Sequence, residues 1–192
     1  MWGRSGAGTK RRMTLAALAL AAAPLGAQAA PPDLKAARAS LAGEWRAELQ
    51  YRDYQSGEWV GIPYTASIAL VGDGVTLVGT SAYDDGPARG IVYITSVAML
   101  GVDGATETTA TFRADRAADL SSATLALSVA RDAEHWTIVA TRDGEDDDRP
   151  ARIRETTTRD GATVTTLKEV DFTDDAGAEW FARNRTIWRR AG

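Results

Sequence analysis

The chain has 192 residues, one histidine, no cysteine and a formal net charge of −4. The absence of cysteine excludes disulfides, thiol chemistry and Cys-based metal sites, and the acidic balance argues against binding nucleic acid or anionic lipid headgroups. A chain of this length, 44% hydrophobic, is long enough for one domain with a sizeable core.

Residues 1–29 have the layout of an export signal. A basic segment at 4–12 precedes an apolar run at 14–26, and Ala27–Ala29 supplies the small-x-small pattern of a cleavage site. We expect cleavage before Ala30; a retained membrane anchor is the alternative, but the apolar run is short for a span. The mature protein should then be soluble in the periplasm or outside the cell, with no stable membrane insertion.

Removal of this segment makes the domain more acidic. The segment carries four of the 22 Lys and Arg residues and none of the 26 Asp and Glu residues, so the net charge falls from −4 to −8. This strengthens the expectation that nucleic acid is not a partner.

Residues 30–42 are predicted to form a linker and a short helix. Asp33 is a candidate N-cap for a helix over Asp33–Leu41, because Leu34, Ala37 and Leu41 share one face at helical spacing. Such a brief, Ala-rich helix should pack on the end of a sheet.

A strand pattern begins at Gly43 and continues to Tyr54. Trp45, Ala47, Leu49 and Tyr51 alternate with polar residues, as they do in a strand with one buried face.

The remainder of the 43–192 domain repeats strand patterns separated by turn signals. Strands are predicted over 59–71, 75–83, 90–100, 106–113, 123–129, 136–140, 151–158, 162–172 and 179–190, with an acidic loop at Gly144–Pro150. The sequence therefore predicts an all-β fold: a single antiparallel meander β-barrel of about eight to ten strands, with a β-sandwich as the alternative.

The strand over Gly90–Leu100 is apolar in both phases. Ile91, Tyr93, Val97 and Met99 would lie on one face, and Val92, Ile94, Ala98 and Leu100 on the other. Burial of both faces would require a covering helix or a subunit contact.

Metal and cofactor chemistry find little support in the sequence. His135 could serve as one axial haem ligand, but it is out of phase with Trp136 and should point away from the core. The acids Asp143 and 145–148 could bind Ca²⁺, yet they lack the spacing of a calcium loop, so a solvated turn is the preferred interpretation. We predict no metal and no cofactor.

Catalytic motifs are also missing. The sequence contains no Gly-x-Ser-x-Gly motif and no glycine-rich phosphate loop, and His135 has no marked serine partner. Nothing in the residues argues for enzyme activity.

The two ends of the domain carry a recognisable combination. Gly43 and Trp45 begin the first strand, and Trp188, Arg189 and Arg190 end the last. This resembles the calycin-like barrels, lipocalins among them, and small exported bacterial barrels of unknown function. The resemblance implies that an Arg from the last strand packs on Trp45 and closes one end of the barrel.

An aromatic and arginine set could line the interior of such a barrel. The candidate ligand-binding residues are Tyr51, Tyr64, Tyr83, Tyr93, Arg154 and Arg185. They lead to the hypothesis of an exported, non-enzymatic barrel that binds a small apolar or amphipathic ligand. In the alternative, the tyrosines are core, the arginines pair with acids outside, and a solid barrel forms a homodimer through strand 90–100.

Overall fold

The computed structural model describes residues 31–53 and 56–192, so the predicted signal at 1–29 lies outside the described residues. Within these ranges, one helix precedes ten strands. Their bounds are α1 Leu34–Ala39, β1 Gly43–Arg52, β2 Trp59–Leu70, β3 Thr76–Asp84, β4 Ile91–Leu100, β5 Thr106–Arg113, β6 Asp119–Asp132, β7 His135–Asp146, β8 Arg149–Asp160, β9 Thr163–Phe172 and β10 Phe181–Arg190.

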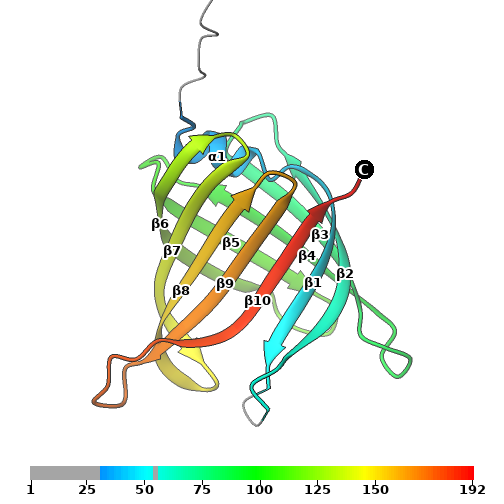
Figure 1. The fold of residues 1–192 in the computed structure, drawn as a ribbon, viewed down its shortest axis with the longest axis vertical. Coiled ribbons are helices and arrows are strands. Elements are labelled where there is room, and N and C mark those ends of the chain that lie inside the picture. The colour runs from blue at the N-terminus through cyan, green and yellow to red at the C-terminus, as the bar shows by residue number, and fades with distance from the viewer. Residues whose placement is uncertain (1–30, 54–55) are drawn as a thin grey trace, which may run out of the picture.

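The strands form one closed antiparallel barrel (Figure 1). Each strand pairs with its neighbours in the chain, and β1 pairs with β10 from Trp45↔Arg190 to Tyr51↔Asn184. Closure removes both sheet edges, which would otherwise expose unpaired backbone groups. The prediction of an all-β meander barrel with a short N-terminal helix is confirmed, and the sandwich alternative is excluded.

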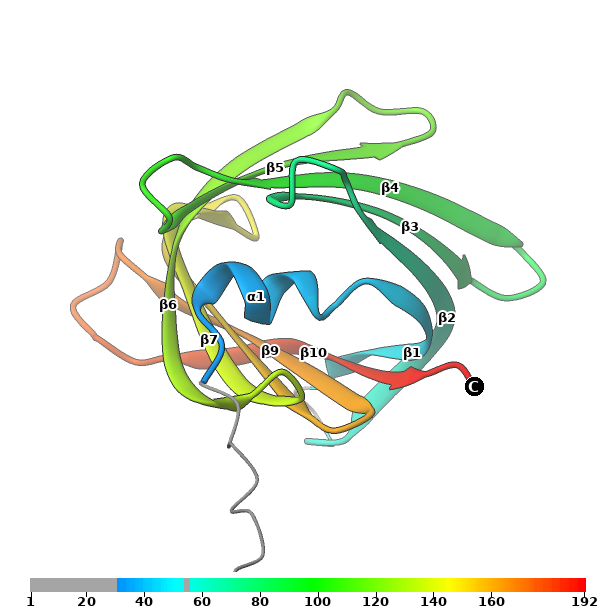
Figure 2. The ribbon, with the colours of Figure 1, turned by 90° about the horizontal axis from the view of Figure 1, so that it is seen from above.

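The helix α1 lies across one end of the barrel (Figure 2). The Asp33 side chain caps it by accepting a hydrogen bond from the Ala36 amide at 2.7 Å. Ala37 is fully buried and Arg38 is only 3% exposed, so the helix penetrates the end of the barrel. We call this the capped end. Among the described residues, no helix has the length and apolarity needed to cross a membrane.

Two core clusters lie near the capped end, and a third joins Ala151, Ile153 and Val170 of β8 and β9. One cluster joins Ala37 to Leu100, Leu125, Trp136 and Ile138. A second cluster consists of Trp45, Tyr64, Ala66 and Val164. Because alternate residues of each strand face inward, these clusters also define which phase of each strand lines the interior.

The predicted acidic loop over Gly144–Pro150 is wrong. Strand β7 continues to Asp146 and β8 begins at Arg149, so the connection is the two-residue turn Asp147–Asp148. Both turn residues have positive φ, 56° and 58°, as the tight turns that match the twist of a hairpin require. The run of acids conceals the strand in the sequence, because consecutive charged residues are typical of a solvated loop.

The two apolar faces of β4 lie in different surroundings. Val92, Ile94 and Leu100 face the interior, while Tyr93 lies outside and is 63% exposed. The helix does not cover the outer face, because α1 sits in the end of the barrel (Figure 2).

Candidate functional site

A cavity of about 210 Å³ lies beneath α1 inside the barrel. Its wall is predominantly apolar and includes Leu41, Ile68, Leu77, Trp136, Ile138 and Trp188. We call it the apolar chamber. Indole and branched aliphatic side chains of this kind line binding sites for hydrophobic groups.

A second cavity, of about 290 Å³, adjoins the first. Glu107, Ala140 and Glu155 line both cavities, so the two spaces meet at these residues. The other lining residues are mostly polar and include Thr109, Thr111, Asp119, Ser121 and Arg142. We call this the polar chamber. The barrel thus encloses an apolar space and a polar space in contact with each other.

Of the two acids at the junction, Glu107 is neutralised by a protein partner. The Arg38 Nε donates to its carboxylate at 2.7 Å, and a second guanidinium nitrogen also donates to it. Arg38 further donates to the backbone carbonyls of Val75 and Ala98. A nearly buried guanidinium with this many acceptors fixes α1 in the barrel end.

Arg142 and Glu155 are not neutralised in this way. Within residues 31–53 and 56–192, no hydrogen bond or ion pair engages either side chain, although both line the polar chamber and are only partly exposed. Partly buried ionic groups without a protein partner are uncommon and call for an explanation. They are the strongest candidates for ligand contact.

The capped end is sealed by the residues singled out at the two ends of the domain. The Arg190 guanidinium lies over the Trp45 ring at 4.6 Å and donates to the Ala42 carbonyl at 2.7 Å. A Cβ on Gly43, whose φ is +138°, would lie 2.1 Å from the Arg190 Nη1. Glycine is therefore needed at position 43 for both its positive φ and its small size. Trp188 packs against Trp45, with ring centroids 5.8 Å apart.

Arg189 does not take part in this packing. It lies in the opposite phase of β10 from Trp188, next to Arg46 of β1 on the outer wall. Of the two terminal arginines, the structure brings Arg190 to Trp45.

A third cavity, of about 330 Å³, lies on the β1–β4 side of the opposite end. Tyr51 and Tyr83 line it together with Asp85, Arg89 and Arg113. Tyr64 stacks on Tyr83 with centroids 4.2 Å apart but is buried, and its hydroxyl accepts a hydrogen bond from Trp188 Nε1. Burial raises the pKa of Tyr64 and that of Tyr83.

The other predicted ligand-binding residues lie outside the barrel. Tyr93 is in the outward phase of β4, opposite Ala82. Arg154 pairs with Glu169 at 2.9 Å and stacks on Trp180. These positions give them no access to the interior chambers.

Arg185 is also on the outer wall. Its guanidinium donates to the Gln50 side chain and lies over the Trp59 ring at 4.5 Å. The phase of a strand can be read from its sequence only if one face is clearly apolar, and neither β8 nor β10 provides that contrast.

The histidine and the acidic run lie in different surroundings. His135 contacts Asp132 at 2.8 Å and Asp160 at 3.5 Å outside the barrel. Among the described residues, no group of three or more His, Asp and Glu side chains could hold a metal ion.

Asp146 departs from the solvated turn expected for the acids. Its Oδ1 accepts from Lys168 Nζ at 2.6 Å, and its Oδ2 lies 2.7 Å from Arg183 Nε. One member of the acidic run therefore joins an ion-pair network across three strands.

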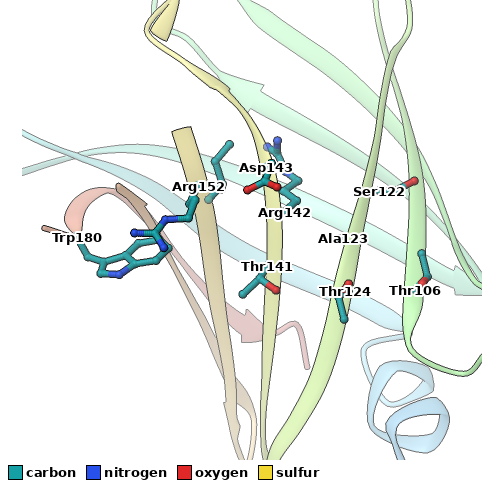
Figure 3. Close-up of a pocket in the computed structure, with 10 residues that line it drawn as sticks. Thr106, Ser122, Ala123, Thr124, Thr141, Arg142, Asp143, Arg152 and Trp180 are labelled. Atoms are coloured by element: carbon teal, nitrogen blue, oxygen red, sulfur yellow. The ribbon is translucent and has the colours of Figure 1, made fainter. Parts of the chain in front are cut away.

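The outer wall carries a shallow hollow of about 450 Å³ (Figure 3). Thr106, Thr124 and Thr141 form its floor, and Arg152 and Trp180 lie together at its rim. Arg152 is already paired with Asp171. This hollow has a larger volume than either interior chamber but is open to solvent, and Arg152 at its rim has its partner within the protein.

Sequence reasoning missed Glu107, Arg142 and Glu155. The signal is strand phase: Glu155 is in phase with Ile153 and Thr157, and Glu107 is in phase with Thr109 and Thr111. An acid in phase with a buried Ile indicates an inward carboxylate, but identifying that phase needed the pairing register.

The sequence matches no protein-family model and no curated protein. The fold is similar to the crystal structure of Rv2717c from M. tuberculosis, with a TM-score of 0.54 and 12% sequence identity. The likeness covers 81% of this chain and 96% of that chain. At this identity the likeness is one of fold alone.

Proposed function

We propose that the protein is an exported, calycin-like barrel that binds a small amphipathic molecule in its interior without transforming it. The observation that carries the proposal is the junction of the apolar chamber with the polar chamber at Glu107, Ala140 and Glu155. An amphipathic ligand could place its hydrocarbon part in the first and its polar end in the second.

Export and family membership are part of the same proposal. The layout of residues 1–29 supports export, since its basic start, apolar run and small-x-small end follow the order of a signal peptide. The packing of Arg190 on Trp45 supports the calycin-like assignment. Cell fractionation and N-terminal sequencing of the mature chain would test export directly.

Ala140 offers a way to test the interior site. Because its small side chain lines both chambers, the benzyl group of Ala140→Phe would fill the junction, and the adjoining cavities give it room. Ala126 of β6 is exposed on the outer wall and provides the matched control Ala126→Phe.

The measurement is saturable fluorescence enhancement of anilinonaphthalene sulfonate, an amphipathic probe. We expect Ala140→Phe to weaken binding by about tenfold or more and Ala126→Phe to leave it unchanged. Equal affinity in the wild type and both variants would reject interior binding.

A second candidate function is a structural module that dimerises through β4. The outward positions of this strand, which are Ile91, Tyr93, Thr95, Val97 and Met99, carry no charge. Two copies of an acidic protein could meet here without like-charge contact. Sedimentation would show a dimer that Tyr93→Lys disrupts; a strict monomer would reject this candidate.

A further inference from the structure

The chemistry of the polar chamber narrows the ligand class. Glu107 is paired with Arg38, which leaves Arg142 and Glu155 as the central ionic groups facing the space. Asp119 lines the same chamber but is exposed near the opposite end. Among the described residues, the partly buried ionic groups that line this cavity without a protein partner are thus one guanidinium, that of Arg142, and one carboxylate, that of Glu155.

The register explains how close these two groups are. Arg142 lies opposite Ile153 and Glu155 lies opposite Ala140, so Arg142 and Glu155 are diagonal neighbours on adjacent strands. Diagonal pairs have Cα atoms about 7–8 Å apart, within reach of long side chains. An internal ion pair could therefore form, yet it does not.

Gly144 accounts for the separation. A Cβ built on Gly144 would lie 2.7 Å from Arg142 Nη1, so the guanidinium occupies the space that the missing side chain leaves. Gly144 is two residues beyond Arg142 on β7, on the side away from Ala140 and its partner Glu155. The glycine lets Arg142 lean away from the carboxylate and keeps the chamber open between them.

We infer that the polar end of the ligand is zwitterionic, with an anionic group that binds Arg142 and a cationic group that binds Glu155. This rests on the proposed interior binding function. A zwitterion provides each unpaired ion with a partner, whereas a singly charged head group leaves one of them desolvated and unpaired. Thr109, Thr111 and Ser121 add hydroxyl groups that can donate or accept.

Three probes with the same octyl chain separate head-group charge from hydrophobicity. They are N-octyl-N,N-dimethylglycine, octanoate and octyltrimethylammonium, which are zwitterionic, anionic and cationic respectively. Calorimetric titration of the wild type should give the highest affinity for the zwitterion, by about tenfold.

Variants assign the preference to individual side chains. Arg142→Gln should abolish the advantage of the zwitterion over the cation, and Glu155→Gln should abolish its advantage over the anion. The controls Arg189→Gln and Glu145→Gln make the same changes at exposed positions of the outer wall and should retain the wild-type order.

Gly144→Ala tests the positioning role of the glycine. The added methyl should displace the guanidinium toward Glu155, where an ion pair would form inside the protein. The zwitterion should then lose about tenfold in affinity although neither ionic residue has changed. An unchanged affinity would overturn the role assigned to Gly144.

The outcomes separate this inference from the proposed function. If none of the three probes binds the wild type, interior binding itself fails. If all bind with similar affinity, or if Arg142→Gln and Glu155→Gln leave the order unchanged, the head-group assignment is overturned while interior binding stands.

Discussion

The capped end and the polar chamber use charged residues in opposite ways. At the capped end, Arg38 has a carboxylate and two carbonyls as partners, and Arg159 donates to the Ser40 and Gly161 carbonyls. In the polar chamber, Arg142 and Glu155 have no partner among the described residues.

The contrast distinguishes stabilising groups from binding groups. A buried charge that is fully hydrogen-bonded fixes local structure, and its loss leaves the partners unpaired. A partly buried charge without a partner lowers the stability of the fold unless a ligand supplies a group that pairs with it. The first kind should therefore govern unfolding and the second should govern binding.

The largest loss of unfolding free energy is expected on removal of the Trp45 side chain. Trp45 is 1% exposed, stacks with Arg190 and donates from Nε1 to the Leu41 carbonyl. Trp45→Ala should lower the free energy of unfolding by about 4 kcal/mol, as measured by denaturant titration. Trp180→Ala on the outer wall should cost much less; equal losses would break the comparison.

The second-largest loss of unfolding free energy is expected on removal of the Arg38 side chain. Arg38→Ala leaves the Glu107 carboxylate without its cation and should cost about 3 kcal/mol of unfolding free energy. Arg142→Gln removes a guanidinium that has no partner in the described part of the chain, and it should leave the free energy of unfolding unchanged or slightly increased. If Arg142→Gln destabilises as much as Arg38→Ala, the distinction between the two regions is lost.

Tyr64→Phe should lower the free energy of unfolding by about 2 kcal/mol, because Trp188 Nε1 loses its acceptor in a buried site.

The two buried phenols also make the stability of the fold depend on pH. The pKa of Tyr64 and that of Tyr83 are raised from 10.0 by burial, so the unfolded chain releases these protons first as pH increases.

Stability should therefore fall as pH rises above about 10. Chemical unfolding above about pH 10 would check that stability falls, and tyrosinate absorbance of the folded protein would check that the two pKa values are raised. Tyr64→Phe should flatten the decline; normal titration of every tyrosine would contradict the assignment.

Substitutions in the β7–β8 turn should have a smaller effect on stability, and this effect should be an increase. Asp147 and Asp148 both have positive φ, and Asn-Gly is the preferred pair for such a turn. Asp147→Asn with Asp148→Gly should raise the midpoint of thermal unfolding, corresponding to about 1 kcal/mol. Glu145→Gln removes one charge from the same hairpin and should change the midpoint less.

The smallest change concerns Asp103 in the β4–β5 turn. Its carboxylate accepts hydrogen bonds from the Thr106 hydroxyl and from the Ala105 and Thr106 amides, which lower its pKa to about 2. Its contribution is present above the ordinary pKa of 3.8 and is lost as pH falls through about 2. NMR titration would measure this pKa, and Thr106→Val should raise it.

The fold followed from local patterns in the sequence. Alternation at Trp45 to Tyr51 and turn signals such as Asp160–Gly161 were enough to predict an antiparallel meander with a short helix. Asp33 was correctly identified as the cap of that helix. These features depend on residues close together in the chain.

The interior could not be predicted in the same way. Strand β4 is apolar in both phases and β5 is threonine-rich in both, so local sequence does not show which face turns inward. That choice depends on pairing across the barrel. Arg38, in an Ala-rich helix, likewise gives no local sign that it enters the barrel and pairs with Glu107 of β5.

A crystal structure of the complex with N-octyl-N,N-dimethylglycine tests the central claim most directly. We expect the octyl chain between Trp136 and Trp188 in the apolar chamber, with its carboxylate at Arg142 and its ammonium near Glu155. A ligand bound only to the outer wall, or an interior into which no octyl chain enters, would contradict the account.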